Sequence, residues 1–187
     1  MRHVISAHVM NEPGVLAEVA NMFAARGFNI DSLVVGRTEN PDVSRITVVV
    51  NGDSNVIDQI HKQLAKLINV QSVRDLEETS YVERDLALVT VNAGPGQRRE
   101  VMDLADNFRG KVVDVSPDTI MLEISGTEEK IEAFVTLVKP YGVREMARTG
   151  VIAMTRGMQP GGSHAPQETA RRHRSLDAGP AEALPPS

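Results

Sequence analysis

Residues 2–35 read RHVISAHVMNEPGVLAEVANMFAARGFNIDSLVV, and this stretch decides the fold. A β-rich run covers Arg2 to Met10. Apolar residues then recur at helical spacing, and the helix should end near Gly27. The run from Phe28 to Val35 is again typical of a strand. The stretch therefore predicts a strand, a helix and a second strand in direct succession.

The residues that follow complete one unit. Ser44 to Val50 predicts a third strand, and Asp53 is suited to cap a second helix. One face of that helix is apolar and consists of Val56, Ile57, Ile60, Leu64 and Leu67. Val70 to Leu76 predicts the last strand. The order βαββαβ is typical of the ferredoxin-like motif.

The same order returns in the second half of the chain. Strands are expected over Asp85–Asn92, Lys111–Val115, the alternating residues Ile120, Leu122 and Ile124, and Tyr141–Arg148. A constant offset places Pro13-Gly14 on Pro95-Gly96. We therefore predict an α+β fold of two ferredoxin-like βαββαβ modules, an N-terminal one over residues 1–78 and a C-terminal one over residues 84–157. They are expected to join around Thr79 to Glu83. Because edge strands usually need pairing, we expect a homodimer or higher homo-oligomer.

The last thirty residues differ from the rest. Residues 158–187 contain no Val, Ile, Phe or Tyr but hold five of the ten prolines. They cannot bury enough apolar surface to offset the entropy of ordering, so a disordered tail is expected. Its cluster Arg171-Arg172-His173-Arg174 could contact an anionic partner, or it could be a solvated stretch of charge.

Composition excludes several classes of protein. The 187 residues include no Cys, which removes disulfides, Fe–S clusters and cysteine zinc sites. A net charge of −5 and an aromatic content of 3% argue against a nucleic-acid partner. No apolar run is long enough to cross a membrane, and the first residues lack a signal-peptide core. We therefore expect a cytoplasmic protein without nucleic-acid or membrane partners.

The sequence holds no catalytic constellation. A nucleophile elbow, a P-loop, an HExxH motif and a dinucleotide fingerprint are all absent, and no metal site is expected. His3 and His8 point to opposite faces of one strand because their spacing is odd. Gly94 to Arg99 could hold a phosphate, but a solvated helix start is the preferred explanation of these residues. The chain is therefore expected to be non-catalytic by itself.

Residues 11–16 combine features that suit ligand binding. They join the first strand to the first helix, where the amides of Gly14, Val15 and Leu16 could face a carboxylate or phosphate. Gly14 would allow a ligand to approach the backbone closely. Asn11 could meet the carboxylate or the ammonium group of an amino acid. The alternative is a helix-entry turn with Asn11 as its cap.

A second segment, residues 26–31, contains Asn29 at the expected start of a strand. Asn is depleted within strands, so an Asn at this position indicates a specific role for its side chain. Hydrogen bonding to a ligand is one reason, and termination of a turn is the other.

These two segments together resemble the amino-acid-binding ACT domain. More narrowly, the chain is similar to the small regulatory subunit of acetolactate synthase (acetohydroxyacid synthase). The resemblance covers about residues 1–157 and includes motifs from both halves: Asn11–Leu16, Arg26–Leu33, Ser44–Thr47, Gln63–Leu67, Val82–Leu86, Phe108–Val115 and Glu145–Gly150.

The resemblance implies regulation in branched-chain amino acid biosynthesis. The large catalytic subunit of this family holds thiamine diphosphate, Mg²⁺ and FAD, and it condenses pyruvate with a second 2-keto acid. No cofactor is expected in the present chain. The small subunit activates its partner and confers feedback inhibition by valine, in some cases with leucine or isoleucine. The alternative is a free-standing ACT-domain amino-acid sensor that regulates another enzyme.

The resemblance also implies an effector site shared by two chains. One chain would contribute Asn11 and the backbone of Gly14, Val15 and Leu16, and the other Asn29 and Ile30. An apolar pocket could be lined by Val15, Leu16, Ile30 and Leu33. In the second module the alignment places Ala93 at the position of Asn11, and no Asn corresponds to Asn29. The second module is therefore expected to lack a matching site.

Overall fold

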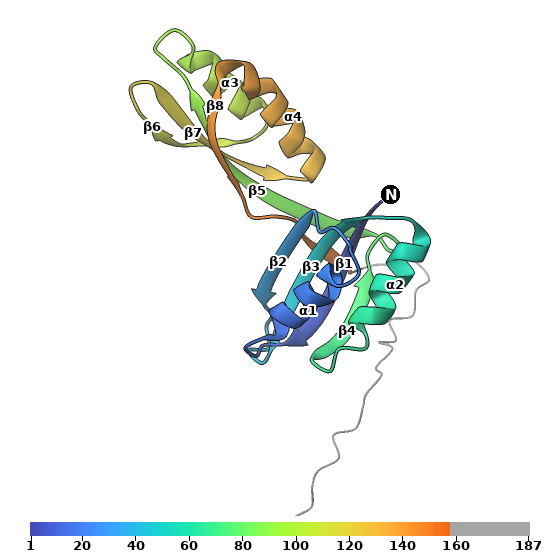
Figure 1. Cartoon of the computed structure of the whole chain (residues 1–187). Coiled ribbons are helices and arrows are strands. Elements are labelled where there is room, and N and C mark those ends of the chain that lie inside the picture. Colours follow the sequence, from blue (N-terminus) through green and yellow to red (C-terminus); the bar gives the residue numbers. More distant parts are fainter. Residues whose placement is uncertain (158–187) are drawn as a thin grey trace, which may run out of the picture.

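The computed structural model describes residues 1–157, which form two α+β modules (Figure 1). The N-terminal module comprises β1 (Arg2–Met10), α1 (Val15–Ala24), β2 (Ser32–Arg37), β3 (Val43–Asn51), α2 (Ser54–Leu64) and β4 (Val70–Asp75). Its strands form an antiparallel sheet in the order β2-β3-β1-β4, so that β2 and β4 are edge strands. The expected disorder of the tail and its arginine cluster concern residues 158–187, which lie outside the described residues.

The C-terminal module repeats this arrangement and adds one strand. It comprises β5 (Tyr81–Asn92), α3 (Arg98–Asn107), β6 (Lys111–Val115), β7 (Thr119–Gly126), α4 (Glu128–Val138), the short 3₁₀ helix η1 (Lys139–Tyr141), β8 (Val143–Arg148) and β9 (Ile152–Thr155). The strand order β6-β7-β5-β8 matches that of the first sheet. The predicted pair of ferredoxin-like modules is therefore confirmed.

Apolar periodicity places each module's helices on one face of its sheet. In α1 the buried residues are Val15, Val19, Met22 and Phe23, which share one face of the helix. They pack against alternate residues of β1, namely Ile5, Ala7 and Val9. The capping predictions are also confirmed, because the Asp53 carboxylate accepts the Val56 N–H at 2.9 Å and the Thr127 hydroxyl accepts the Lys130 N–H at 3.4 Å.

Three parts of the sequence-based assignment were wrong. Strand β2 begins at Ser32 rather than Phe28, because residues 28–31 form a coil. Phe28 and Ile30 nevertheless pack against the core, which accounts for their strand-like alternation. Strand β9 had no counterpart in the predicted order, and β5 begins at Tyr81, inside the segment expected to join the modules.

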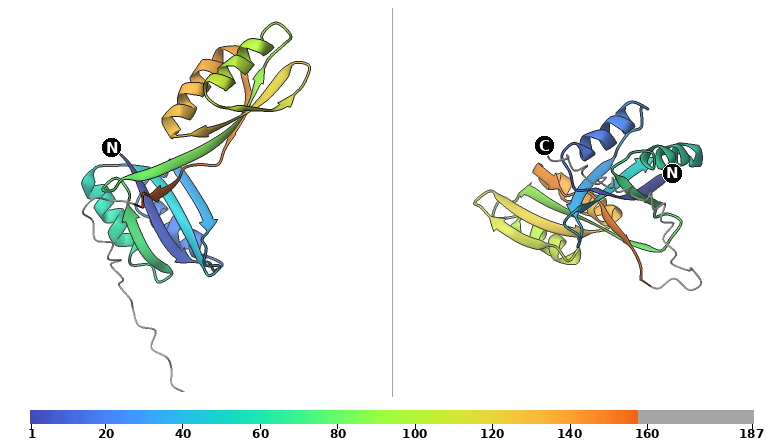
Figure 2. Two further views of the ribbon diagram at one scale, coloured as in Figure 1. Left: turned by 180° about the vertical axis from the view of Figure 1, so that it is seen from behind. Right: turned by 90° about the horizontal axis from the view of Figure 1, so that it is seen from below.

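Strand β9 and the start of β5 form a ribbon that lies across the N-terminal module. Tyr81 pairs with Thr155, and Glu83 pairs with Ala153. Seen from behind, this ribbon crosses the sheet face opposite α1 and α2 (Figure 2). It completes a small second core there, formed by Val4, Val49, Leu76, Val151 and Ala153. The C-terminal end of the described chain thus stabilises the N-terminal sheet.

Ala153→Asp should destabilise the protein much more than the same change at the next residue. Ala153 is 3% exposed in the second core, whereas Met154 is 62% exposed on the outer side of the ribbon. Burying an unpaired polar group there costs about 2 kcal/mol of unfolding free energy, within the range of about 1–3 kcal/mol found for proteins. Urea unfolding at neutral pH measures the loss, with Met154→Asp as the matched control. Equal stability of the two variants would contradict the packing of β9 on the first sheet.

Candidate functional site

The N-terminus of α1 is shaped by Gly14. Gly14 is the N-cap residue with φ 92°, a left-handed conformation that favours glycine. It makes no side-chain cap, and within the described chain the amides of Gly14 and Leu16 have no hydrogen-bond partner. The Val15 N–H makes one long bond of 3.4 Å to the Glu12 carbonyl oxygen. This helix end can therefore accept an anionic group, as such ends commonly do.

Asn11 does not cap the helix, so that alternative was wrong. Its Nδ2 donates to the Pro41 carbonyl oxygen at 2.9 Å, and its Oδ1 accepts the Ser44 hydroxyl at 3.1 Å. Its backbone N–H donates to the Asp42 carbonyl oxygen. Asn11 thus ties the segment before α1 to the turn between β2 and β3 and to the start of β3, and the residue is exposed.

Asn29 and Ile30 lie in the coil that precedes β2. Asn29 is exposed, and its Nδ2 donates to Asp31 Oδ1 at 2.9 Å. Asp31 also accepts a hydrogen bond from Asn51 Nδ2. Ile30 is half-buried against the N-terminal core. The coil is therefore anchored by Ile30 and Asp31, and Asn29 Oδ1 makes no hydrogen bond within residues 1–157.

The two halves of the candidate site do not meet within one chain. Residues 11–16 lie at the start of α1 and residues 29–30 beyond its end. Ten helical residues span about 15 Å at 1.5 Å per residue. Two cavities of the described chain, lined by other residues, contain none of the six candidates. A site that combines both groups, as the resemblance implies, would therefore need a second copy of the chain.

The free edge of β2 offers the geometry for such a pairing. Within residues 1–157, β2 pairs with β3 alone. At its end, Arg37 lies opposite Ser44, which bonds to Asn11. Two β2 edges related by a two-fold axis run antiparallel, so the start of one lies beside the end of the other. Asn29 and Ile30 of one copy would then approach Asn11 and Gly14 of the other.

The expected apolar lining needs one correction. Val15 is 3% exposed and belongs to the core, so its side chain cannot line an open pocket. Leu16 is 45% exposed, and Leu33 and Ile30 are half-buried at the rim of the core. Val35 of β2 is 42% exposed, which sequence reasoning had not singled out. Its period-two position along an edge strand is the signal that could have identified it.

The second module lacks the corresponding features. Ala93 stands where the first module has Asn11, and it is fully buried. Only residues 108–110 separate α3 from β6, so the counterpart of the coil with Asn29 is absent. Helix α3 begins after Gln97, one position later than the alignment with α1 predicts. That this module has no equivalent amino-acid site stays a prediction.

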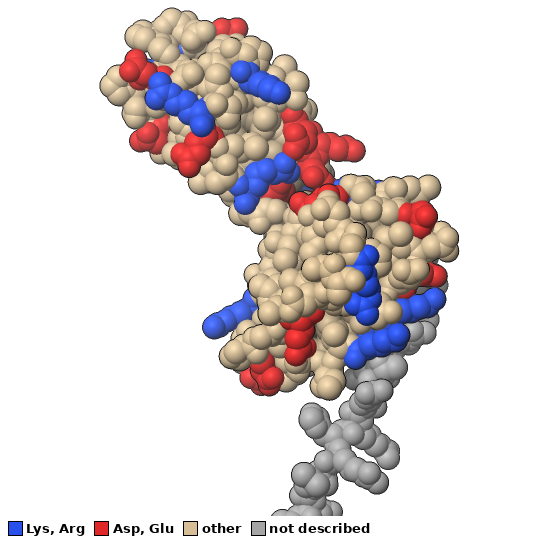
Figure 3. All heavy atoms as spheres, viewed as in Figure 1, with Lys and Arg blue, Asp and Glu red and all other residues tan. Residues whose placement is uncertain are grey.

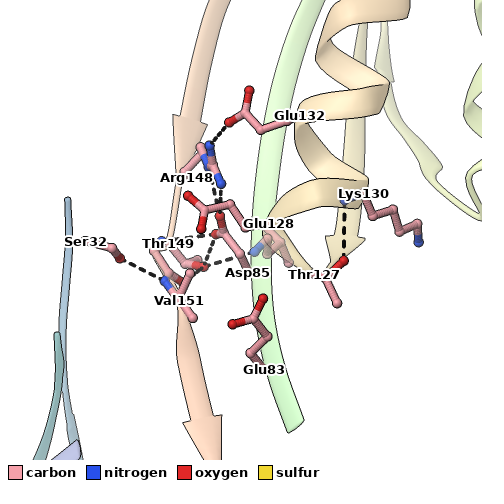
Figure 4. A network of polar contacts seen from close by, with 12 residues as sticks. Ser32, Glu83, Asp85, Thr127, Glu128, Lys130, Glu132, Arg148, Thr149 and Val151 are labelled. Atoms are coloured by element: carbon pink, nitrogen blue, oxygen red, sulfur yellow. Dashed lines mark hydrogen bonds and ion pairs between the residues drawn. The ribbon is translucent and has the colours of Figure 1, made fainter. Parts of the chain in front are cut away.

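A polar network at the junction of the modules was not foreseen from the sequence (Figure 4). The Asp85 carboxylate, whose side chain is 1% exposed, accepts hydrogen bonds from Arg148 Nε and Nη2 at 2.8 and 2.5 Å. It also accepts the Thr149 hydroxyl at 3.2 Å and the Gly150 N–H at 3.1 Å. Burial alone lowers the pKa of Arg148, but the hydrogen bonds and charge of Asp85 and Glu132 raise it above its usual value. Arg148 therefore stays charged.

Arg2 links the same junction from the first strand. Its Nη2 contacts Glu83 Oε2 and its Nε contacts Glu128 Oε2, both at 2.8 Å. Acidic side chains gather where the modules meet (Figure 3). A polar cleft of about 260 Å³ lies there, lined by residues of both modules that include Asp31, Glu128 and Thr149. Arg2 and Arg148 offset part of this negative charge.

The histidines of β1 have structural partners. His3 Nδ1 lies 2.9 Å from Asp75 Oδ2, and His8 Nδ1 lies 3.1 Å from the Ser72 hydroxyl. Burial lowers the pKa of His8, and the charges of Arg45 and Arg74 lower it further. A neutral ring can accept the hydrogen bond from Arg45 Nη2 at its Nε2, which is 3.1 Å away.

Among residues 1–157, no His, Asp and Glu side chains cluster as metal ligands. No helix in the described range is long and apolar enough to cross a membrane.

Comparisons with known proteins identify both modules. Residues 5–72 match the family described as the AHAS small subunit-like ACT domain. Residues 84–157 match the family described as the small subunit of acetolactate synthase. The two matches correspond to the two sheets with their helices.

Whole relatives agree with these matches. The chain is 50% identical over 157 residues to a probable acetolactate synthase small subunit of Archaeoglobus fulgidus, covering 84% of this chain and 98% of the relative. It is 44% identical over 160 residues to the Bacillus subtilis acetolactate synthase small subunit, covering 85% and 93%. The crystal structure of the Thermotoga maritima small subunit superposes with a TM-score of 0.77 at 44% identity, covering 83% and 98%. The chain therefore belongs to the family of acetolactate synthase small subunits, regulatory proteins built on ACT domains.

Proposed function

We propose that this chain activates a catalytic large subunit of acetolactate synthase and confers feedback inhibition by valine. It would act in cytoplasmic synthesis of branched-chain amino acids, and it would bind valine between the ACT modules of two copies. The observation that carries the effector site is the free edge of β2, which has Asn29 and Ile30 before its start and Asn11 beside its end.

The chemistry of this arrangement suits an amino-acid zwitterion. The amides of Gly14 and Leu16 can hold the carboxylate at the positive end of α1. Asn29 Oδ1 from the partner copy can accept a hydrogen bond from the ammonium group. Leu16, Ile30, Leu33 and Val35 supply apolar surface for a small aliphatic side chain. Leucine and isoleucine remain alternative effectors, since one methylene changes binding in such a pocket by only about 1–3 kcal/mol.

Catalysis is assigned to the large subunit. That partner would hold thiamine diphosphate, Mg²⁺ and FAD and would perform the condensation of pyruvate. The proposal rests on family membership, because the relatives bear the name of a small subunit of this enzyme. Valine can then inhibit only by binding one arrangement of the assembly more tightly than another.

Reconstitution with the cognate large subunit tests this function. Purified small subunit should raise the rate of acetolactate formation from pyruvate, and valine should reverse that gain. The small subunit alone should form no acetolactate. If the small subunit binds valine but neither stimulates nor inhibits the large subunit, the chain is instead a free-standing amino-acid sensor for another enzyme.

A further inference from the structure

The junction of the modules begins directly after the candidate effector coil. Ser32, the first residue of β2, accepts the Val151 N–H on its Oγ at 3.0 Å. The backbone of Gly150 also lies close to β2. A Cβ added there would lie 2.8 Å from both Ser32 Oγ and Val34 Cγ2, and φ at Gly150 is 84°. Residues 150 and 151 therefore rest directly on β2, and only glycine permits this approach.

The same residues are fixed to the C-terminal module through Asp85. The carboxylate holds the Gly150 N–H, the Thr149 hydroxyl and the Arg148 guanidinium together. Arg148 Nη1 then contacts Glu132 Oε1 on α4 at 2.5 Å. The Thr149 hydroxyl also accepts the Leu86 N–H of β5 at 3.1 Å. A displacement of residues 150 and 151 would consequently move β5 and α4 with it (Figure 4).

A separate tie fixes the C-terminal module to the centre of the first sheet. Arg2 belongs to β1, a central strand, and it reaches Glu83 of β5 and Glu128 at the start of α4. The C-terminal module is thus linked to β1 through Arg2 and to the edge strand β2 through Ser32. A shift of β2 relative to β1 would therefore change the orientation of this module.

We propose that the contact between Ser32 and Val151 transmits effector binding from the ACT module to the C-terminal module. This inference rests on the proposed function. An effector held by Asn29 and Ile30 would fix the coil two residues before Ser32 and so set the position where β2 begins. Residues 150 and 151 would follow, and the Asp85 network would reorient the C-terminal module. Ser32 is accordingly a positioning residue for regulation and not a part of the effector site.

Separate measurements of binding and inhibition test this role. Ser32→Ala removes the acceptor of the Val151 N–H and changes the side-chain volume little. Ser54→Ala is the matched control, because Ser54 is exposed and makes no side-chain hydrogen bond within residues 1–157. Calorimetry gives the dissociation constant of valine for each small subunit alone. Acetolactate formation by the reconstituted enzyme gives the valine concentration for half-maximal inhibition.

We expect Ser32→Ala to bind valine within about twofold of the wild type but to need at least about fivefold more valine for inhibition, a typical lower bound for coupling between sites. Ser54→Ala should match the wild type in both measurements. If the enzyme reconstituted with Ser32→Ala is inhibited at the same valine concentration as the wild type, this inference is overturned and the proposed function is unaffected. Loss of valine binding by Ser32→Ala would also overturn it, because Ser32 would then belong to the effector site. A wild-type chain that neither binds valine nor responds to it would overturn both this inference and the proposed function.

Discussion

Gly14→Asp should leave a small subunit that still stimulates the catalytic subunit but no longer confers inhibition by valine. The new carboxylate would stand at the helix end where the effector carboxylate is held, and placing like charges together costs several kcal/mol. We expect the valine concentration for half-maximal inhibition to rise at least about 100-fold. The fold should persist, because a Cβ at Gly14 meets no atom within 4 Å, although φ 92° adds some strain.

Gly96→Asp is the control for the added charge, although Gly96 does not share the positive φ of Gly14. Gly96 aligns with Gly14 in the second module, is exposed, and also has no atom within 4 Å of an added Cβ. It should leave inhibition unchanged, since the second module has no counterpart of the Asn11 side chain or of the coil that holds Asn29.

Asn29→Ala provides a second variant that adds no charge. It should raise the inhibitory valine concentration about 10- to 100-fold, the loss of one hydrogen bond to a charged group. Inhibition at the wild-type concentration in both Gly14→Asp and Asn29→Ala would refute the site.

Asp85→Ala should lower the free energy of unfolding by about 3 kcal/mol. This is the largest loss of stability that we expect from removing one polar side chain of the described residues. Removing one partner of a buried pair typically costs 3–5 kcal/mol, because the other charge stays behind without compensation. The lower end applies here, since Arg148 is 23% exposed and keeps its contact with Glu132. The Gly150 N–H and the Thr149 hydroxyl also lose an acceptor.

Chemical denaturation of Asp85→Ala and Asp58→Ala measures this difference. Asp58 is 74% exposed and has only a 3.8 Å contact to Lys62, so its removal should change stability by no more than about 0.5 kcal/mol. Asp85→Asn keeps the shape of the side chain and should fall between the two. A loss below about 1 kcal/mol for Asp85→Ala would mean that the network does not hold the junction.

Local patterns were sufficient to predict the repeat and most of its elements. The spacing of Val15, Val19, Met22 and Phe23 reflects burial along one helix face, which depends only on residues within that helix. The capping roles of Asp53 and Thr127 are equally local. Residues 28–31 were misassigned because Phe28 and Ile30 alternate like a strand while packing onto the core from a coil.

Contacts between distant residues could not be predicted in this way. Strand β9 has four residues, and its partners in β5 lie about seventy positions earlier, so neither segment alone indicates the pairing. Asp85 and Arg148 are 63 positions apart, and Arg84-Asp85 had the composition of an ordinary polar pair. For the effector site, the sequence predicted two groups of residues, before and after the first helix, and their role stays a prediction. Only the structure places the two groups beside opposite ends of β2.

The central claim is that each effector site combines residues from two chains, and mixing of variants tests it most directly. Dimers of Gly14→Asp alone or Asn29→Ala alone have a defect in both sites. In a mixed dimer one site carries both defects and the other carries neither. After denaturation and refolding at equal amounts, calorimetry should therefore recover about one quarter of the wild-type valine stoichiometry with wild-type affinity, because half of randomly formed dimers are mixed. If each chain forms its own site, every site carries one defect and mixing will restore no wild-type binding.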